Sequence, residues 1–284
     1  MKQFSEASEE RRVNFNAGKL EAELRYWRNE FATPPPPLPL LTLASVNERP
    51  ILKAYENARA DCKISVNTKR QILNVCRRLR ATPFHFYLAA LRALLLCYTV
   101  GEEDITMAVA ESGRGHKGDD LNVIGPLYNL VLVRLIVKLS TKFEDLLEAT
   151  RDKTYAGLEN SRYPYPMLVK ELHLQRNAKH YPFFQVFVDY RMGQRHTVNW
   201  GEYNKLVFMG FDLNVPYDVY LDTVDDQDGE CTHYLFLRKD LFSKDAAERL
   251  ARSYKCLIEA FAAQPGMTAS DVDLSDPVDL EGMR

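Results

Sequence analysis

The sequence lacks the patterns that mark metal, disulfide and nucleotide sites. Its five cysteines are scattered without any C-x-x-C pair, and their odd number favours reduced thiols. None of the six histidines has a neighbour at metal-ligand spacing, so no bound metal is expected. No G-x-S-x-G motif, Walker loop or dinucleotide fingerprint is present. The glycine-rich residues 113–118 lack the G-K-[ST] ending of a phosphate loop.

An excess of charge of one sign and a long apolar run are also missing. Lys and Arg number 37 against 39 Asp and Glu, a net charge of −2 that gives no reason to expect nucleic acid or membrane binding. No apolar run approaches the ~20 residues that span a bilayer, and the charged N-terminus lacks the core of a signal peptide. We therefore expect a cytoplasmic protein, and 284 residues are enough to bury a substantial core.

What is present is an alternation of helical and strand patterns. Helices are expected over 18–31, 68–80 and 82–98, from 141, near 165–174 and from 243. Strands are expected over 61–66, 104–110, 130–137 and 183–190, and 219–224 with 232–237 reads as a hairpin. The expected helix caps are Asn67 or Thr68, Thr82 before Pro83, Thr141 in a capping box with Glu144, and Ser243. This mixture predicts an α/β or α+β class with one main sheet.

Three histidines require an interpretation because imidazole is a common catalytic base. His85 lies in the first turn of an apolar helix, where a packed or capping role is expected. His116 lies in a polar glycine-rich loop and is expected to be solvated. His233 alternates within the hairpin, and the sequence leaves open which side of the sheet it faces.

The most informative stretch is 124–134, IGPLYNLVLVR, an apolar strand with an Asn at its mouth and an Arg within it. An unpaired charge in such a strand is costly, so Arg134 is expected to pair with a carboxylate in a structural role. The amide of Asn129 can both donate and accept hydrogen bonds. It is either a contact for a ligand or a cap that bonds the backbone of its own strand.

Several passages, taken in order, resemble the C-terminal half of a condensation domain, the amide-forming acyltransferase of nonribosomal peptide synthetases. Residues 20–27 (LEAELRYW) with 37–40 (PLPL) are similar to the passage that joins the family's two lobes. Residues 82–98 resemble the first helix of the C-terminal lobe, and 124–134 resembles IGxFVNTLVLR with Gly125, Asn129 and Arg134 in register. PFFQVFVDY at 182–190 resembles a family strand, and DYR at 189–191 and PYDV at 216–219 are wordings of fungal polyketide–peptide hybrid synthases. The resemblance covers about residues 4–275.

The resemblance implies a chloramphenicol-acetyltransferase-like α/β lobe, with one mixed β-sheet flanked by helices. It divides the chain into an inter-lobe helix and linker start (1–33), a Pro-rich linker (34–60), the C-terminal lobe (61–265) and an acidic tail (266–284). It also implies that one wall of a substrate tunnel is formed by Asn129, Tyr128, Gly125, Ser112 and Arg114. Arg114 is either a contact at the tunnel mouth or a loop anchor.

By the same resemblance, the activity is formation of an amide between a polyketide acyl thioester and an aminoacyl thioester. Both substrates are carried on phosphopantetheine arms, by an acyl carrier protein and a peptidyl carrier protein, and no cofactor is bound directly. The catalytic histidine is expected in the HHxxxDG motif of an N-terminal lobe, because the 284 residues contain no His-His. That lobe is a further expected partner of this chain. The chain alone is therefore expected to be inactive. The alternatives are a truncated, non-catalytic domain for carrier docking or product shaping, and a stand-alone acyltransferase that uses another residue.

Overall fold

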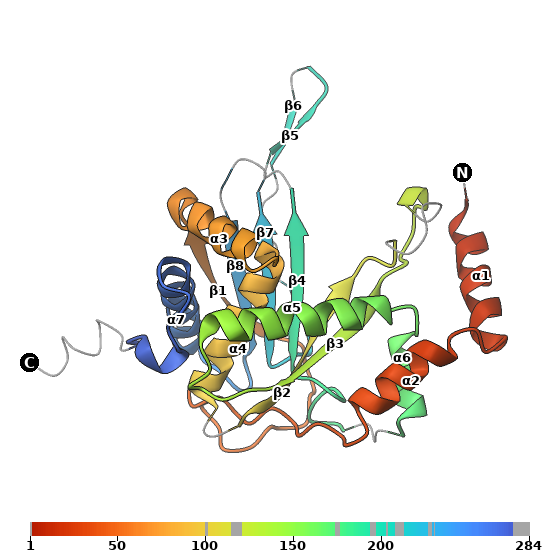
Figure 1. The fold of residues 1–284 in the computed structure, drawn as a ribbon, viewed down its shortest axis with the longest axis horizontal. Helices are drawn as coiled ribbons and strands as arrows, with labels where there is room; N and C mark the ends of the chain where they lie inside the picture. The colour runs from red at the N-terminus through yellow and green to blue at the C-terminus, as the bar shows by residue number, and fades with distance from the viewer. Residues whose placement is uncertain are drawn as a thin grey trace, which may run out of the picture.

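The fold is a six-stranded mixed sheet with helices packed on it, seen in a computed structural model (Figure 1). The structure describes residues 2–99, 102–114, 121–173, 177–193, 197–202, 204–207, 213–226, 229 and 231–274. The strand order is β1-β8-β7-β4-β2-β3. The strands are β1 (Asn57–Ile64), β2 (Asp104–Glu111), β3 (Asn129–Ile136), β4 (Val186–Met192), β7 (Val219–Asp225) and β8 (Cys231–Arg238). The expected α/β class with one mixed sheet is confirmed.

Parallel and antiparallel pairs give the sheet its polarity. β4 pairs in parallel with both β2 and β7, whereas β3, β8 and β1 join by antiparallel pairs. The carboxyl ends of β2, β4 and β7 therefore lie at one edge of the sheet, and their amino ends lie at the opposite edge. The predicted hairpin of 219–224 with 232–237 is confirmed as β7 and β8.

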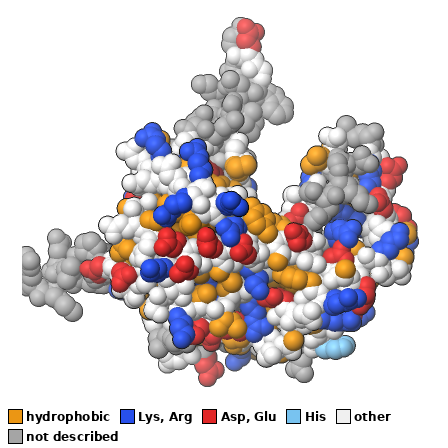
Figure 2. Space-filling view, viewed as in Figure 1, with side chains coloured by type: hydrophobic (Ala, Val, Ile, Leu, Met, Phe, Trp, Pro, Cys, Tyr) orange, Lys and Arg blue, Asp and Glu red, His pale blue; other side chains and the backbone are white. Residues whose placement is uncertain are grey.

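Four helices cover one face of this sheet: α3 (Val66–Arg78), α4 (Pro83–Tyr98), α5 (Phe143–Glu159) and α7 (Lys244–Ala263). α4 packs against α3, α5 and α7 and is buried on almost all sides, which explains why its sequence is apolar nearly all round. Figure 2 shows acidic and basic side chains interspersed over this side of the molecule, as expected from the near-neutral charge.

Three further helices lie toward the β3 side: α1 (Phe4–Asn16), α2 (Glu21–Glu30) and α6 (Tyr165–Glu171). The sequence predicted α2 and α6 but not α1, because α1 is charged and polar around its circumference and buries only Ala7. A separate hairpin of β5 (Thr197–Trp200) and β6 (Asn204–Val207) projects from the sheet and was also not predicted. Within the described residues, no single helix is long and apolar enough to cross a membrane, although α3 and α4, bent by 101°, pass that test as a pair.

Two helix starts were predicted correctly from a local cap. Thr82 caps α4 with Pro83 in the first turn, and the Nδ1 atom of His85 accepts a hydrogen bond from the Thr82 backbone N–H at 3.1 Å. The expected capping role of His85 is therefore confirmed. Ser243 caps α7 by accepting a hydrogen bond from the Ala246 N–H at 3.1 Å.

Two predicted caps are wrong. α3 begins at Val66, and its cap is Ser65, whose hydroxyl accepts from the N–H of Thr68 at 3.1 Å, rather than Asn67 or Thr68.

The expected box of Thr141 and Glu144 does not form either, since α5 begins at Phe143 after Lys142. The first free N–H groups of α5 donate instead to the carbonyls of Met267 and Pro265, at 2.8 and 2.9 Å. The segment that follows α7 thus supplies the acceptors that a capping side chain would have provided.

Candidate functional site

A cavity of about 220 Å³ lies where α1 meets the carboxyl end of β2 and the start of β3. Its wall is formed by side chains of α1, by Glu111 and Gly113, by Tyr128 and Asn129, and by the segment 161–166. Of the residues predicted for a tunnel wall, Tyr128 and Asn129 line this cavity. Tyr128 is 66% exposed, which makes it accessible from solvent.

Asn129 ties the start of β3 to the segment that leads into α6. Its amide nitrogen donates to the carbonyls of Ser161 and Tyr163 at 2.7 and 2.9 Å. Its amide oxygen accepts from the backbone N–H of Tyr165 at 3.0 Å. The side chain thus clamps a cavity wall, rather than capping its own strand. One lone pair of the amide oxygen remains for a further donor.

The other three predicted residues, Gly125, Ser112 and Arg114, lie together in the loops beside the cavity. The Arg114 guanidinium donates to the Val123 and Gly125 carbonyls at 3.2 and 2.6 Å, and to the Ser112 carbonyl at 3.0 Å. The Ser112 hydroxyl accepts from the Arg114 N–H at 3.3 Å. Of the two interpretations of Arg114, this geometry is that of a loop anchor.

Helix α1 is docked onto the same loops, a contact that the sequence did not reveal. The Arg11 guanidinium donates to the Leu127 carbonyl at 2.8 Å and also to the Gly113 carbonyl. Gly125 has a φ of +153°, and a Cβ atom there would lie 2.5 Å from Cδ2 of Phe4. A glycine is therefore required at the point where α1 approaches the loop. Arg11 lies more than a hundred residues from its acceptors, so no local motif announces it.

The cavity is lined by charges of both signs. Lys2 pairs with Glu10 at 2.7 Å across α1, and Arg162 pairs with Glu23 of α2. Glu111 is only 9% exposed, and among the described residues its Oε2 atom has no hydrogen-bond partner. The cavity therefore presents a buried acceptor whose partner is not supplied by the described chain.

Arg134 pairs with a carboxylate, as predicted. Its Nε and Nη2 atoms donate to Asp104 at 2.9 and 2.6 Å, and Nη1 donates to the carbonyls of Thr33 and Glu30. The hydrogen bond to Asp104 raises the pKa of Arg134. Arg134 thus fastens the end of α2 and the start of the Pro-rich linker to the outer strand of the sheet.

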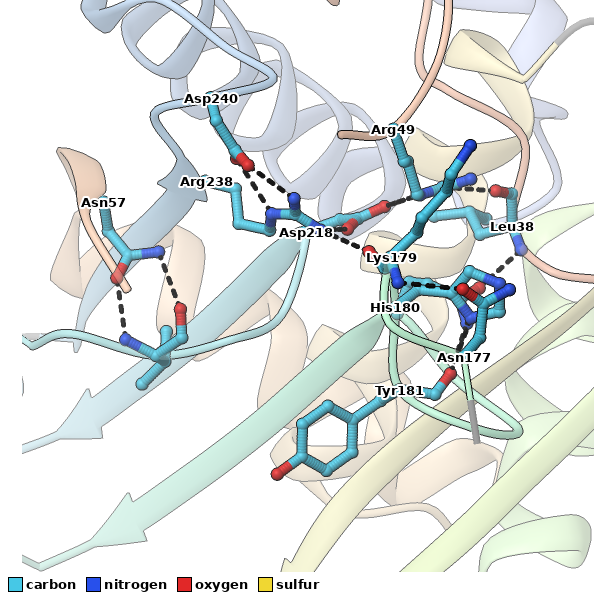
Figure 3. Close-up of polar contacts among 12 residues, drawn as sticks. Leu38, Arg49, Asn57, Asn177, Lys179, His180, Tyr181, Asp218, Arg238 and Asp240 are labelled. Carbon is cyan, nitrogen blue, oxygen red and sulfur yellow. Dashed lines mark hydrogen bonds and ion pairs between the residues drawn. The ribbon is translucent and has the colours of Figure 1, made fainter. Parts of the chain in front are cut away.

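A second buried polar group lies at the opposite edge of the sheet, where β7 begins and β8 ends (Figure 3). We call Arg49, Asp218 and Arg238, together with the exposed Asp240 that pairs with Arg238, the Asp218 cluster. Asp218 accepts from Arg49 Nε at 2.7 Å and from Arg238 Nη1 at 3.3 Å, and Arg238 also donates to Asp240 at 2.9 and 2.6 Å. Burial raises the pKa of Asp218, while both arginines act in the opposite direction.

The Asp218 cluster anchors the linker to the sheet. The guanidinium of Arg49 donates to the Leu38 carbonyl, and that of Arg238 donates to the Lys179 carbonyl at 2.8 Å. Nearby, Asn57 exchanges two hydrogen bonds with the backbone of Val215, at 2.8 and 3.2 Å (Figure 3).

Neither of the two buried histidines lines the cavity. Burial lowers the pKa of His85 to about 4 and that of His233 to about 3, so both rings are neutral at pH 7. His233 lies on the helix-covered side of the sheet, edge-on to Tyr87 at 4.5 Å and bonded to Thr223 at 2.9 Å. His116 lies outside the described residues. In the described ranges, no group of three His, Cys, Asp or Glu side chains is placed to hold a metal ion.

Comparison with known proteins identifies the family. The chain matches the family described as Condensation domain over residues 1–283. It is 63% identical over 279 residues to the polyketide synthase-nonribosomal peptide synthetase TwmB of Talaromyces wortmannii, covering 97% of this chain and 9% of that protein. It is 32% identical to the hybrid PKS-NRPS synthetase pydA of an Acremonium species, covering 98% of this chain and 7% of that protein. The chain thus spans less than a tenth of these relatives.

The fold agrees with that assignment. The solved condensation domain from the monacolin K polyketide synthase MokA superposes with a TM-score of 0.84 at 24% identity, covering 94% of this chain and 62% of that one. The predicted chloramphenicol-acetyltransferase-like lobe is thereby confirmed as a fold, and the resemblance to fungal polyketide–peptide hybrids is confirmed by the relatives. The chain belongs to the condensation-domain family.

Proposed function

We propose that this chain is the C-terminal lobe of a condensation domain that joins a carrier-bound polyketide acyl thioester to a carrier-bound aminoacyl thioester. The observation that carries this proposal is the 63% identity, over 97% of the chain, to a protein named as a polyketide synthase-nonribosomal peptide synthetase. The proposed arrangement keeps the predicted boundaries, with 1–33 and 34–60 between the lobes, 61–265 as the lobe and 266–284 as a tail, except that β1 moves the start of the lobe forward to Asn57.

In the proposed reaction, the amine nitrogen attacks the thioester carbonyl carbon. The C–N bond forms, the C–S bond breaks, and the proton lost by the amine ends on the departing thiol. No cofactor takes part directly, because both reactants arrive on phosphopantetheine arms of acyl and peptidyl carrier proteins. The second lobe of the domain is the remaining partner, and it would carry the HHxxxDG histidine.

The contribution of this lobe is to hold one wall of the reaction chamber. Alignment of two tethered reactants can lower a bimolecular barrier by up to about 7–11 kcal/mol. The Asn129 clamp fixes the wall segment 161–165, and Arg114 and Arg11 fix the loops beside it. Tyr128, Gly125 and Ser112 complete the proposed wall. The compartment proposed for the protein is the cytoplasm, in keeping with its free cysteines.

The test uses the natural protein with both lobes, an acyl-loaded acyl carrier protein and an aminoacyl-loaded peptidyl carrier protein. Mass spectrometry of the carrier-bound product is expected to show the new amide. The 284-residue chain incubated alone with the same carriers is expected to give none. Absence of amide from the folded two-lobe protein with fully loaded carriers would contradict the proposal.

The second candidate is a non-catalytic domain that docks carriers or shapes products. The same assay separates the two candidates, because a docking domain would bind the loaded carriers without forming product.

A further inference from the structure

Glu111 lines the cavity and has a carboxylate oxygen that no described residue satisfies. It is the last residue of β2 and lies directly opposite Asn129 of β3 in the antiparallel register. Opposite residues of such a pair have Cβ atoms about 5 Å apart on the same face of the sheet. Glu111 is 9% exposed, and its Oε2 atom is buried without a hydrogen-bond partner in the described chain. An unpaired buried carboxylate oxygen is unfavourable, so a donor at this position would be strongly bound.

The cations that line the cavity are engaged elsewhere. Lys2 forms an ion pair with Glu10 at 2.7 Å, and Arg162 forms one with Glu23. The guanidinium of Arg11 donates to the carbonyls of Leu127 and Gly113.

The amide of Asn129 is also committed. Both of its N–H donors are used by the Ser161 and Tyr163 carbonyls. Its oxygen accepts one hydrogen bond, from the Tyr165 N–H, and has a second lone pair for a further donor. Two acceptors, a carboxylate and an amide oxygen, thus occupy paired positions on adjacent strands, and the group that suits both of them is a donor of several N–H bonds.

We propose that the cavity binds a primary amine, with Oε2 of Glu111 accepting one N–H and Oδ1 of Asn129 accepting another. This inference rests on the proposed function and deepens it, because the amine would be that of the aminoacyl thioester. A carboxylate accepts but does not donate, and its bonds to amino groups are among the stronger hydrogen bonds in proteins. Glu111 is then the residue that orients the attacking nitrogen before the C–N bond forms.

The first experiment measures kinetics in the natural two-lobe protein. Glu111→Gln keeps the shape of the side chain and removes its charge. It is expected to raise the KM for the aminoacyl carrier protein about ten- to hundredfold, and to leave the KM for the acyl carrier protein unchanged. Glu9→Gln removes the same charge from an exposed residue of α1 and is the matched control. An unchanged KM for the aminoacyl carrier, or an equal rise for both carriers, overturns the inference.

The second experiment uses the 284-residue chain and separates a failure of Glu111 from a failure of the proposed function. Alaninamide, a primary amine, and N-acetylalaninamide, its blocked form, are titrated by NMR. Alaninamide is expected to bind the natural chain at least tenfold more tightly than the Glu111→Gln variant, and the blocked form is expected not to bind. Equal binding to both proteins, no binding of alaninamide, or equal binding of the blocked form overturns the inference, whether or not the two-lobe protein makes an amide.

Discussion

Two of the buried polar regions among the described residues lie at opposite edges of one sheet, and they compensate their buried charge differently. At the Asp218 cluster, a carboxylate that is buried on folding receives two arginines, and one of these is held by a further aspartate. At the cavity, Glu111 is 9% exposed, against 2% for Asp218, and one of its oxygens is buried without a partner in the described chain. At one edge, the two arginines offset the cost of removing the Asp218 carboxylate from water. At the other edge, the bound amine of the proposal offsets that cost for Glu111.

This difference separates residues that hold the fold from residues that serve the reaction. The Asp218 cluster ties the linker around Leu38 and Arg49 to the sheet, far from the cavity. Asn129 belongs to both categories, because its three hydrogen bonds stabilise a loop that is also a cavity wall.

Breaking the Asp218 cluster is expected to have the largest effect on stability. Arg238→Ala leaves Asp218 with one arginine and should lower the free energy of unfolding by about 3–5 kcal/mol. Urea denaturation measures this loss. The control is Lys239→Ala, which removes a neighbouring exposed ion pair with Glu56 and should cost under about 1 kcal/mol. Similar, small losses for both variants would show that the cluster is not a structural anchor.

Acidification is expected to destabilise the helix-covered core through His85. Its folded pKa of about 4 lies below the ordinary value of 6.5, so the neutral ring contributes stability above pH 6.5 that is lost as the pH falls toward 4. The shift corresponds to about 3 kcal/mol. His85→Gln keeps a residue suited to the capping box of Thr82 but cannot titrate. Urea denaturation at pH 7 and pH 4 should show a smaller acid loss for this variant, and an equal loss would rule out His85 as its source.

Removing the Asn129 clamp is expected to affect both stability and reaction. Asn129→Ala deletes three hydrogen bonds and leaves the carbonyls of Ser161 and Tyr163 without this donor. A loss of about 2 kcal/mol in the free energy of unfolding is expected, with a rate of condensation that falls further than this loss explains. Chemical denaturation and a single-turnover assay on the same preparation measure the two effects. Full rate in the folded variant would mean that Asn129 only stabilises the loop.

The approach of α1 to the loop at Gly125 is expected to give the smallest effect on stability. Gly125→Ala requires a left-handed backbone and brings a Cβ atom against Phe4, which should cost about 1–2 kcal/mol. Gly18 also has a positive φ, of +68°, but a Cβ atom there meets no atom within 4 Å, so Gly18→Ala is a control without the contact. Hydrogen exchange of α1 should increase in the first variant and stay nearly unchanged in the second. Equal exchange in both would mean that Phe4 does not fix the helix.

The order of helices and strands was predictable from the sequence because it depends on local patterns of apolar and polar residues. The residues of the cavity were only partly predictable. Thr82 and Ser243 cap their helices through residues three positions away, so sequence alone identified them. The expected box at Thr141 failed because acceptors come from Pro265 and Met267, more than a hundred residues later.

The same limit applies to the cavity. Asn129 stood out as a polar residue at the mouth of an apolar strand, but its partners lie 32 to 36 residues farther along the chain. Glu111 carries no motif. Its proposed role depends on its burial, on its position opposite Asn129 and on the ion pairs that already hold the nearby cations. All three arise only in the folded chain.

One paired measurement tests most directly whether the two edges of the sheet have different roles. Melting temperature and single-turnover amide formation are measured on Glu111→Gln and Asp218→Asn in the natural two-lobe protein, with limiting aminoacyl carrier. We predict that Glu111→Gln keeps its melting temperature and slows amide formation at least tenfold, because it changes a ligand contact. Asp218→Asn should melt at a lower temperature while its folded fraction retains the natural rate. The reverse pattern, or the same pattern in both variants, would contradict the account.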